Sequence, residues 1–135
     1  MLLDELGLFL QQQGHGTLGT TLFRGKLPLD APGLSVADQV IALIPVPGLP
    51  PVREHGLTRF EQPVVQVLTR GAQYGEEAAF AKAQATWLSL DGLSNVVLSG
   101  VTYLWIMAMQ SPYYLRVDDW GRPHVLYNLR CARAL

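Results

Sequence analysis

The fold class is decided by residues 76–110, which read EEAAFAKAQATWLSLDGLSNVVLSGVTYLWIMAMQ. Apolar residues at helical spacing in Glu76–Leu90 predict an amphipathic helix, and Gly92 ends it. The predicted apolar stripe consists of Phe80, Ala83, Trp87 and Leu90. Two apolar runs follow at once, Val96–Leu98 and Thr102–Gln110, and each predicts a strand. A helix that leads directly into neighbouring strands is typical of an α+β domain.

The flanking sequence extends this order of elements. Apolar residues at helical spacing predict a first helix around Leu2, Leu6, Phe9 and Leu10, ended by Gly14 and Gly16. Further strands are predicted at Thr20–Leu27, Val40–Ile44, Val64–Arg70 and Val125–Ala132. A turn is predicted at Asp118–Pro123, between the strands Thr102–Gln110 and Val125–Ala132. Residues 1–135 therefore predict a single α+β domain, with a mainly antiparallel sheet and two helices packed on one face.

The segment Pro45–Pro63 differs from the rest because it contains five prolines and two glycines. Proline lacks the backbone N–H that a sheet ladder uses, and it restricts φ. We therefore expect a stiff loop or an extended arm at about residues 45–63. Its candidate contact residues for another subunit or a partner are Arg53, His55 and Arg59.

The strand predicted at Thr102–Gln110 is apolar on both faces. Strict alternation assigns Val101, Tyr103, Trp105, Met107 and Met109 to one face, and Leu104, Ile106 and Ala108 to the other. A strand of this kind is central in its sheet, or another subunit covers one of its faces.

Composition points to an assembly. Hydrophobic residues make up 49% of the chain and charged residues 16%, whereas average domains are about 25% charged. Eight of the ten basic residues are arginines, and the other two are Lys26 and Lys82. Because subunit interfaces favour arginine and are depleted in lysine, we infer an obligate homo-oligomer.

Several classes of protein are excluded. A net charge of -1 argues against an electrostatic nucleic-acid binder. The apolar run Val101–Met109 has about half of the ~20 residues that a membrane helix needs. Asp4 and Glu5 do not fit the basic start of a signal peptide. The lone Cys131 cannot form an intrachain disulfide and is predicted to be a buried thiol, which indicates synthesis in a reducing cytoplasm.

No catalytic, cofactor or metal site is predicted. The three histidines, His15, His55 and His124, lie in turn or loop contexts without metal-ligand spacing, so we expect surface or hydrogen-bonded roles. Asp118 and Asp119 with His124 leave a small metal-dependent homo-oligomeric enzyme as an alternative. Adjacent carboxylates in a turn, however, more often bond backbone amides.

Aromatic and arginine side chains provide further interface candidates. Trp120 is expected to be exposed in its turn, where Tyr113 and Tyr114 can join it in a contact patch or in a ligand-binding module. Arginines lie in or beside the predicted strands at Arg24, Arg70, Arg116 and Arg130. Two interpretations of these arginines stay open, a solvated face and ion pairs between subunits.

Three blocks of the sequence resemble the small tail terminator proteins of long-tailed phages and prophages, a group also described as minor capsid proteins. The first block is TLGT at 17–20 with LFRGKLP at 22–28. The second is PVVQV at 63–67 with Arg70, Gly71 and Tyr74. The third consists of Tyr103, Ile106, QSP at 110–112, Asp118–Pro123 and Asn128. The blocks occur in the same order as in that group and span most of the chain.

The resemblance implies a structural virion protein without catalytic residues or cofactor. Proteins of this group form a ring, commonly a hexamer, that caps the tail tube, ends its polymerisation and presents a surface to the head-completion protein. The implied partners are other copies of the chain, the tail tube protein and the head-completion or connector protein, with the tape measure protein as a further candidate. DNA passes through the lumen without specific binding, and no membrane is involved. The implied location is the head–tail junction of the virion, and the host cytoplasm during assembly. Another ring component of that junction, a stopper or connector, is the alternative.

Overall fold

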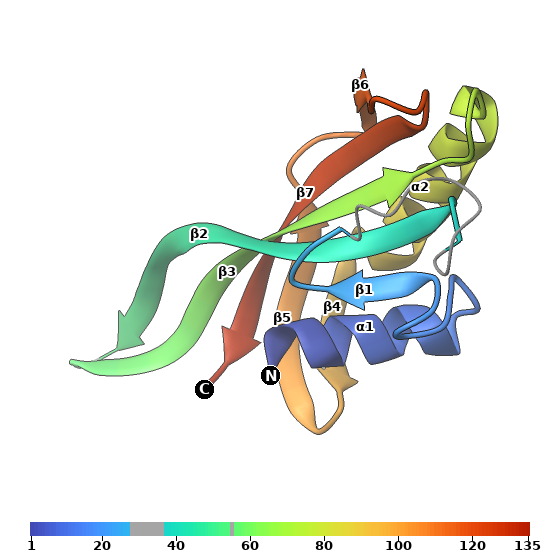
Figure 1. Cartoon of the computed structure of the whole chain (residues 1–135). Helices are drawn as coiled ribbons and strands as arrows, with labels where there is room; N and C mark the ends of the chain where they lie inside the picture. The colour runs from blue at the N-terminus through green and yellow to red at the C-terminus, as the bar shows by residue number, and fades with distance from the viewer. Residues whose placement is uncertain (28–36, 55) are drawn as a thin grey trace.

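The computed structural model describes residues 1–27, 37–54 and 56–135, so the predicted contact residue His55 lies outside the described residues (Figure 1). The elements are α1 (Leu2–Gln12), β1 (Leu22–Arg24), β2 (Val40–Glu54), β3 (Leu57–Arg70), α2 (Glu76–Leu90), β4 (Leu93–Leu98), β5 (Val101–Ala108), β6 (Tyr113–Val117) and β7 (Pro123–Ala134). Both predicted helices are confirmed, and Glu76–Leu90 has the predicted bounds.

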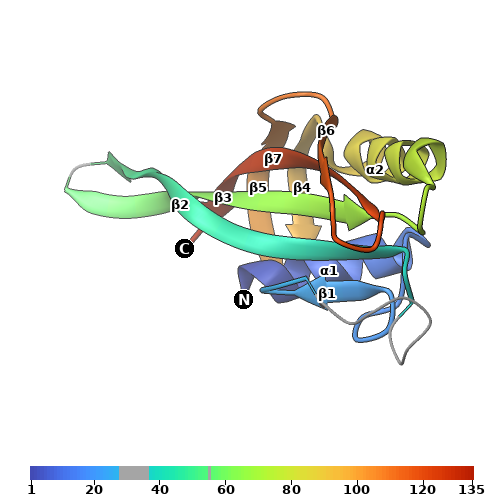
Figure 2. The ribbon, with the colours of Figure 1, turned by 45° about the horizontal axis from the view of Figure 1, so that its top comes forward.

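The described strands form one sheet, with the order β1-β2-β3-β7-β5-β4. β6 pairs with the first residues of β7, on the same edge that β5 occupies further along. All pairings between these strands are antiparallel except that of β1 with β2. Figures 1 and 2 show both helices against one face of the sheet, α1 beside β1 and α2 across β7 and β3. The predicted α+β fold is therefore confirmed.

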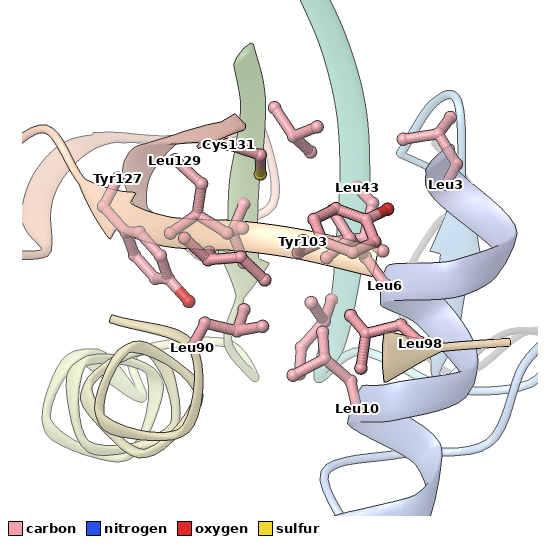
Figure 3. Close-up of a cluster of buried hydrophobic side chains, with 14 of the residues drawn as sticks. Leu3, Leu6, Leu10, Leu43, Leu90, Leu98, Tyr103, Tyr127, Leu129 and Cys131 are labelled. Carbon is pink, nitrogen blue, oxygen red and sulfur yellow. The ribbon is translucent and has the colours of Figure 1, made fainter. Parts of the chain in front are cut away.

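The hydrophobic core lies between this sheet face and the helices (Figure 3). Leu6 and Leu10 of α1 are fully buried in one cluster with Leu90 of α2, Tyr103 of β5 and Cys131 of β7. The predicted burial of the Cys131 thiol is confirmed, and burial raises its pKa to about 12.

The buried face of α2 differs from the predicted stripe. It consists of Ala79, Ala83, Thr86 and Leu90. The prediction is wrong for Phe80, which is 40% exposed. The cause is close packing: a Cβ added to Gly71 would lie 2.7 Å from the Cβ of Ala79, so only small side chains fit there.

Residues 45–54 and 57–63 form strands and not a loop. β2 and β3 stay paired from Val40 opposite Arg70 out to Glu54 opposite Leu57. β1 pairs with only three residues of β2, so beyond them none of the described strands on that edge needs the N–H groups that proline lacks. Register shifts between Val46 and Arg53 accommodate the remaining irregularity. The strand predicted at 40–44 is therefore ten residues too short, because edge strands tolerate proline.

The C-terminal half contains two further departures from the predictions. Tyr103 and Ile106 were predicted on opposite faces, but both are fully buried, because a register shift against β7 follows Tyr103. β5 lies between β7 and β4, so its predicted central position is confirmed. β6 was not predicted, and the turn at Asp118–Pro123 joins β6 to β7 instead of β5 to β7.

Candidate assembly interface

The first candidate surface is the arm, defined as residues 46–54 and 56–62. Its outer end projects past the rest of the sheet, while Phe60 and Glu61 still pair with Ala134 and Arg133 of β7 (Figures 1 and 2). Its apolar side chains Leu49 and Val52 are 41% and 40% exposed. Arg53 and Arg59 are also exposed, and neither forms an ion pair with the described residues. The arm therefore presents both apolar and cationic side chains to a second molecule.

An ion cluster centred on the buried Glu5 holds the base of the arm to the body. Arg133 donates from Nε to Glu5 Oε1 at 2.9 Å, from Nη2 to Glu5 Oε2 at 2.7 Å and from Nη1 to Glu61 Oε1 at 2.8 Å. The Tyr103 hydroxyl donates to Glu5 at 2.6 Å, and the Met1 amino group lies 2.8 Å from Glu5 Oε2. These interactions, that of Arg133 first, lower the pKa of Glu5 to about 2. Sequence reasoning missed this cluster, because Glu5 and Arg133 are 128 positions apart.

The turn between β6 and β7 is fixed by Asp118. Its Oδ1 accepts hydrogen bonds from the backbone N–H groups of Trp120 at 3.0 Å and Arg122 at 2.9 Å, and its Oδ2 accepts from Arg122 Nε at 2.7 Å. Burial opposes ionisation, but the bonds from Arg122 and Trp120 lower the pKa of the Asp118 carboxyl. The prediction that a carboxylate of this turn bonds backbone amides is confirmed.

The structure exposes the three predicted contact aromatics. Tyr113 and Tyr114 open β6 and are 41% and 48% exposed, and Trp120 is 41% exposed in the turn. The Arg122 guanidinium lies 5.0 Å from the centroid of the Trp120 ring and covers it on one side. These side chains are available to a second molecule.

Arg70 and His124 are directly paired across β3 and β7, and both are buried. Arg70 donates from Nε to the Asp38 carbonyl at 2.8 Å and from Nη2 to the Ala37 carbonyl at 3.0 Å, so it does not lie on the surface as the prediction required. His124 is 1% exposed, and neither ring nitrogen has a hydrogen-bond partner among the described residues. His124 is therefore buried and not on the surface, and its Nε2 lies 3.7 Å from Asp118 Oδ2. Burial, followed by the charge of Arg116, lowers the pKa of His124.

The sheet face opposite the helices carries a second apolar surface. The Arg130 guanidinium lies 5.0 Å from the centroid of the Trp105 ring. Met107 and Met109, which are 41% and 55% exposed, line a pocket of about 300 Å³ beside Arg130. Of the arginines predicted to face solvent or another subunit, Arg24 pairs with Asp4 of α1.

The described residues give little support to the alternative of a metal-dependent enzyme at Asp118, Asp119 and His124. Asp118 Oδ2 lies 3.7 Å from His124 Nε2, but that oxygen already holds Arg122. Within residues 1–27, 37–54 and 56–135, no group of three or more His, Cys, Asp or Glu side chains is placed to hold a metal ion. None of the described helices has the length and apolar character needed to span a membrane.

Comparison with known proteins identifies the family. A chain of a solved structure described as "Virion of native gene transfer agent (GTA) particle" is similar, with a TM-score of 0.63 and 15% identity over 96% of this chain and 84% of that one. A second solved chain has a TM-score of 0.57 and 14% identity over 99% of this chain and 91% of that one. The search for relatives among curated proteins found no match. The model of a family described as bacteriophage tail terminator protein matches residues 9–134. This chain is therefore a structural protein of the phage tail rather than an enzyme, and it belongs to the bacteriophage tail terminator protein family.

Proposed function

We propose that copies of this chain close into a ring, expected to be a hexamer, that caps the tail tube and ends its polymerisation. The observation that carries the proposal is the arm, on a chain whose family match spans residues 9–134. The arm exposes apolar and cationic side chains far from the core, as a contact with another subunit requires.

Ring closure needs two different surfaces on each subunit, because a head-to-tail interface joins unlike patches related by rotation. The molecule offers several exposed surfaces: the arm, the aromatic side chains of β6 and its turn, and the methionines of the helix-free sheet face. A charged fraction of only 16% supports the burial of a large share of this surface in the assembly.

The cap ends polymerisation because its two ends differ. One end of the ring binds the last ring of tube protein, and the other presents a new surface to the head-completion or connector protein, so the tube repeat stops. The tape measure protein is a further candidate partner in the lumen. The near-neutral chain, with a net charge of -1, suits a channel through which DNA passes without being held. The ring then resides at the head–tail junction, after assembly in the host cytoplasm.

Two measurements test this function. Light scattering across concentration gives the mass of the purified chain, where we expect about six times the 14.9 kDa of one subunit. Electron microscopy then follows the growth of the cognate tube protein, and we expect the chain to shorten tubes when added at the start. Addition after growth has ended is the control, because a cap cannot then shorten them.

The results separate the alternatives. A chain that neither forms rings nor shortens tubes contradicts the proposal. A ring that leaves tube length unchanged identifies a stopper or connector component of the same junction instead.

A further inference from the structure

We infer that, in the proposed ring, the arm of each copy docks on the turn surface of the next copy, where Arg53 and Arg59 pair with its carboxylates. The turn surface is defined as Tyr74, Glu76, Glu77, Asp119 and Trp120. The inference rests on the proposed function, because it assigns the contact that closes the ring.

The two surfaces lie at opposite ends of the molecule. Figures 1 and 2 show the arm at one end, and the start of α2 with the β6–β7 turn at the other. A surface and its complement at opposite ends of one chain form a heterologous interface, the type that generates rings. Two arms cannot pair with each other in the same way, because their exposed arginines would repel.

The turn surface is one continuous structure. The backbone N–H of Tyr74 donates to the Gly121 carbonyl at 3.0 Å, which joins the segment before α2 to the β6–β7 turn. Tyr74 is 77% exposed, and its φ of 59° is a conformation that bulky residues disfavour. Aromatic rings beside carboxylates suit guanidinium groups, which stack on the rings and bond the oxygens in pairs.

The carboxylates of the turn surface are available. Glu76, Glu77 and Asp119 are exposed, and none of them forms an ion pair with another described residue. Arg53 and Arg59 on the arm are equally unpaired and exposed within the described chain. The charges of the two ends are therefore complementary, and within the part of the chain that the structure describes neither set of charges forms an ion pair in its own subunit.

A buried polar group indicates that the turn surface receives another molecule. A pocket of about 290 Å³ lies at the turn, and its lining residues include Asp119, Trp120 and His124. His124 is 1% exposed, and both of its nitrogens lack hydrogen-bond partners among the residues described. Buried polar groups in folded proteins are nearly always bonded, so an uncharged polar group of the docked arm, which the neighbouring cations Arg70 and Arg116 tolerate, is expected to complete the bonds of His124.

Three cations near this pocket decide where the arm binds. Arg70, which is directly paired with His124, is buried and bonded to the carbonyls of Asp38 and Ala37. Arg122 is neutralised by Asp118 and Asp38, at 2.7 Å and 3.3 Å. Arg116 is exposed and lies opposite His124 across β6 and β7, so it disfavours a second cation beside it. The arginines of the arm are therefore expected on the side of the pocket that carries Asp119.

Charge reversal tests the pairing. The arm variant R53E/R59E and the turn variant E76R/D119R each place like charges at every interface of a ring. We expect both to fall from the mass of about six chains to the 14.9 kDa of one chain. The combined variant carries all four substitutions, has the net charge of the wild type and is expected to regain the ring.

Mixing provides a second readout that a merely structural effect would not produce. In a ring that alternates the arm variant with the turn variant, every interface joins opposite charges, so an equimolar mixture is expected to assemble although neither variant does so alone. The control is K26E, which reverses an exposed cation outside both surfaces and is expected to keep the ring. Circular dichroism verifies that all variants are folded.

The outcomes distinguish this pairing from the ring itself. If the arm variant keeps the mass of the wild type, or if neither the combined variant nor the mixture forms a ring, the pairing is overturned while the ring stands. If the wild-type chain is a single subunit at every concentration, the ring is overturned and the pairing with it.

Discussion

The substitution Glu5→Gln removes one charge from the ion cluster at the base of the arm while keeping the size of the side chain. Glu5 is 2% exposed and accepts two hydrogen bonds from Arg133 and one from the Tyr103 hydroxyl. Glutamine has only one acceptor oxygen, and its amide group would point N–H donors at the donors of Arg133. We therefore expect a loss of stability larger than that of a surface ion pair.

The magnitude follows from the pKa of Glu5. A decrease from 4.5 to about 2 on folding corresponds to roughly 3 kcal/mol of stability at neutral pH. Because the pKa is lower in the folded state, this stability is complete above pH 4.5 and is lost as the pH falls through 2. Roughly 1 kcal/mol of it remains at pH 3. Glu5→Gln is thus expected to destabilise the wild type by about 3 kcal/mol at pH 7 and by less than half of that at pH 3.

Urea unfolding followed by tryptophan fluorescence measures both values, at one protein concentration so that assembly contributes equally. The control is Glu61→Gln, because Glu61 is 38% exposed and contacts the same arginine through a single bond. We expect the control to cost at most about 1 kcal/mol. A loss below 1 kcal/mol for Glu5→Gln at pH 7, or equal losses at both pH values, would refute this reasoning.

Three further predictions concern the core. Tyr127→Phe removes a buried hydroxyl that lies 2.8 Å from Thr86 Oγ1, and is expected to cost about 1–2 kcal/mol in urea unfolding. Gly71→Ala places a Cβ 2.7 Å from that of Ala79, and is expected to lower the free energy of unfolding by about 1–3 kcal/mol. The thiol of Cys131, with its pKa raised to about 12, is expected to resist a thiol reagent at pH 8 until urea unfolds the chain.

Each of these three predictions has a control measurement that can contradict it. Tyr114→Phe alters an exposed hydroxyl and should leave stability unchanged, so equal effects at the two tyrosines would contradict the buried bond. Ala81 lies on the exposed side of α2, so Ala81→Ser should leave the free energy of unfolding nearly unchanged. If Gly71→Ala also leaves it unchanged, α2 can move away from the sheet without loss of stability, which contradicts the prediction. Labelling of Cys131 in the folded chain at the rate seen in urea would show that the core opens.

Periodicity predicted the helices and most of the strands because both depend on which side chains face the core. The helix at Glu76–Leu90 was predicted at its observed bounds, but its buried face was not. Phe80 is more apolar than Ala79, yet Ala79 is buried, since the distance between helix and sheet admits only a small side chain. Hydrophobicity therefore located the helix, and the packing distance oriented it.

The features of the candidate interface were likewise only partly predictable from the sequence. The exposure of Trp120 follows from its place in a turn, and turn chemistry is local. The burial of Arg70 and His124 was not predictable, because residues 37–38 and the paired strands that enclose these side chains are distant in sequence. The pairing of Glu5 with Arg133 likewise joins the two ends of the chain.

The amino-acid sequence by itself determined the fold class, the exclusion of a catalytic constellation and the resemblance to tail terminators, because composition, periodicity and motif order are properties of the linear chain. Only the tertiary structure decided that the proline-rich segment is a paired arm and that the arm and the turn surface lie at opposite ends. The physical reason is that strand pairing and ion pairing depend on distances between residues far apart in sequence, which exist only after the chain has folded.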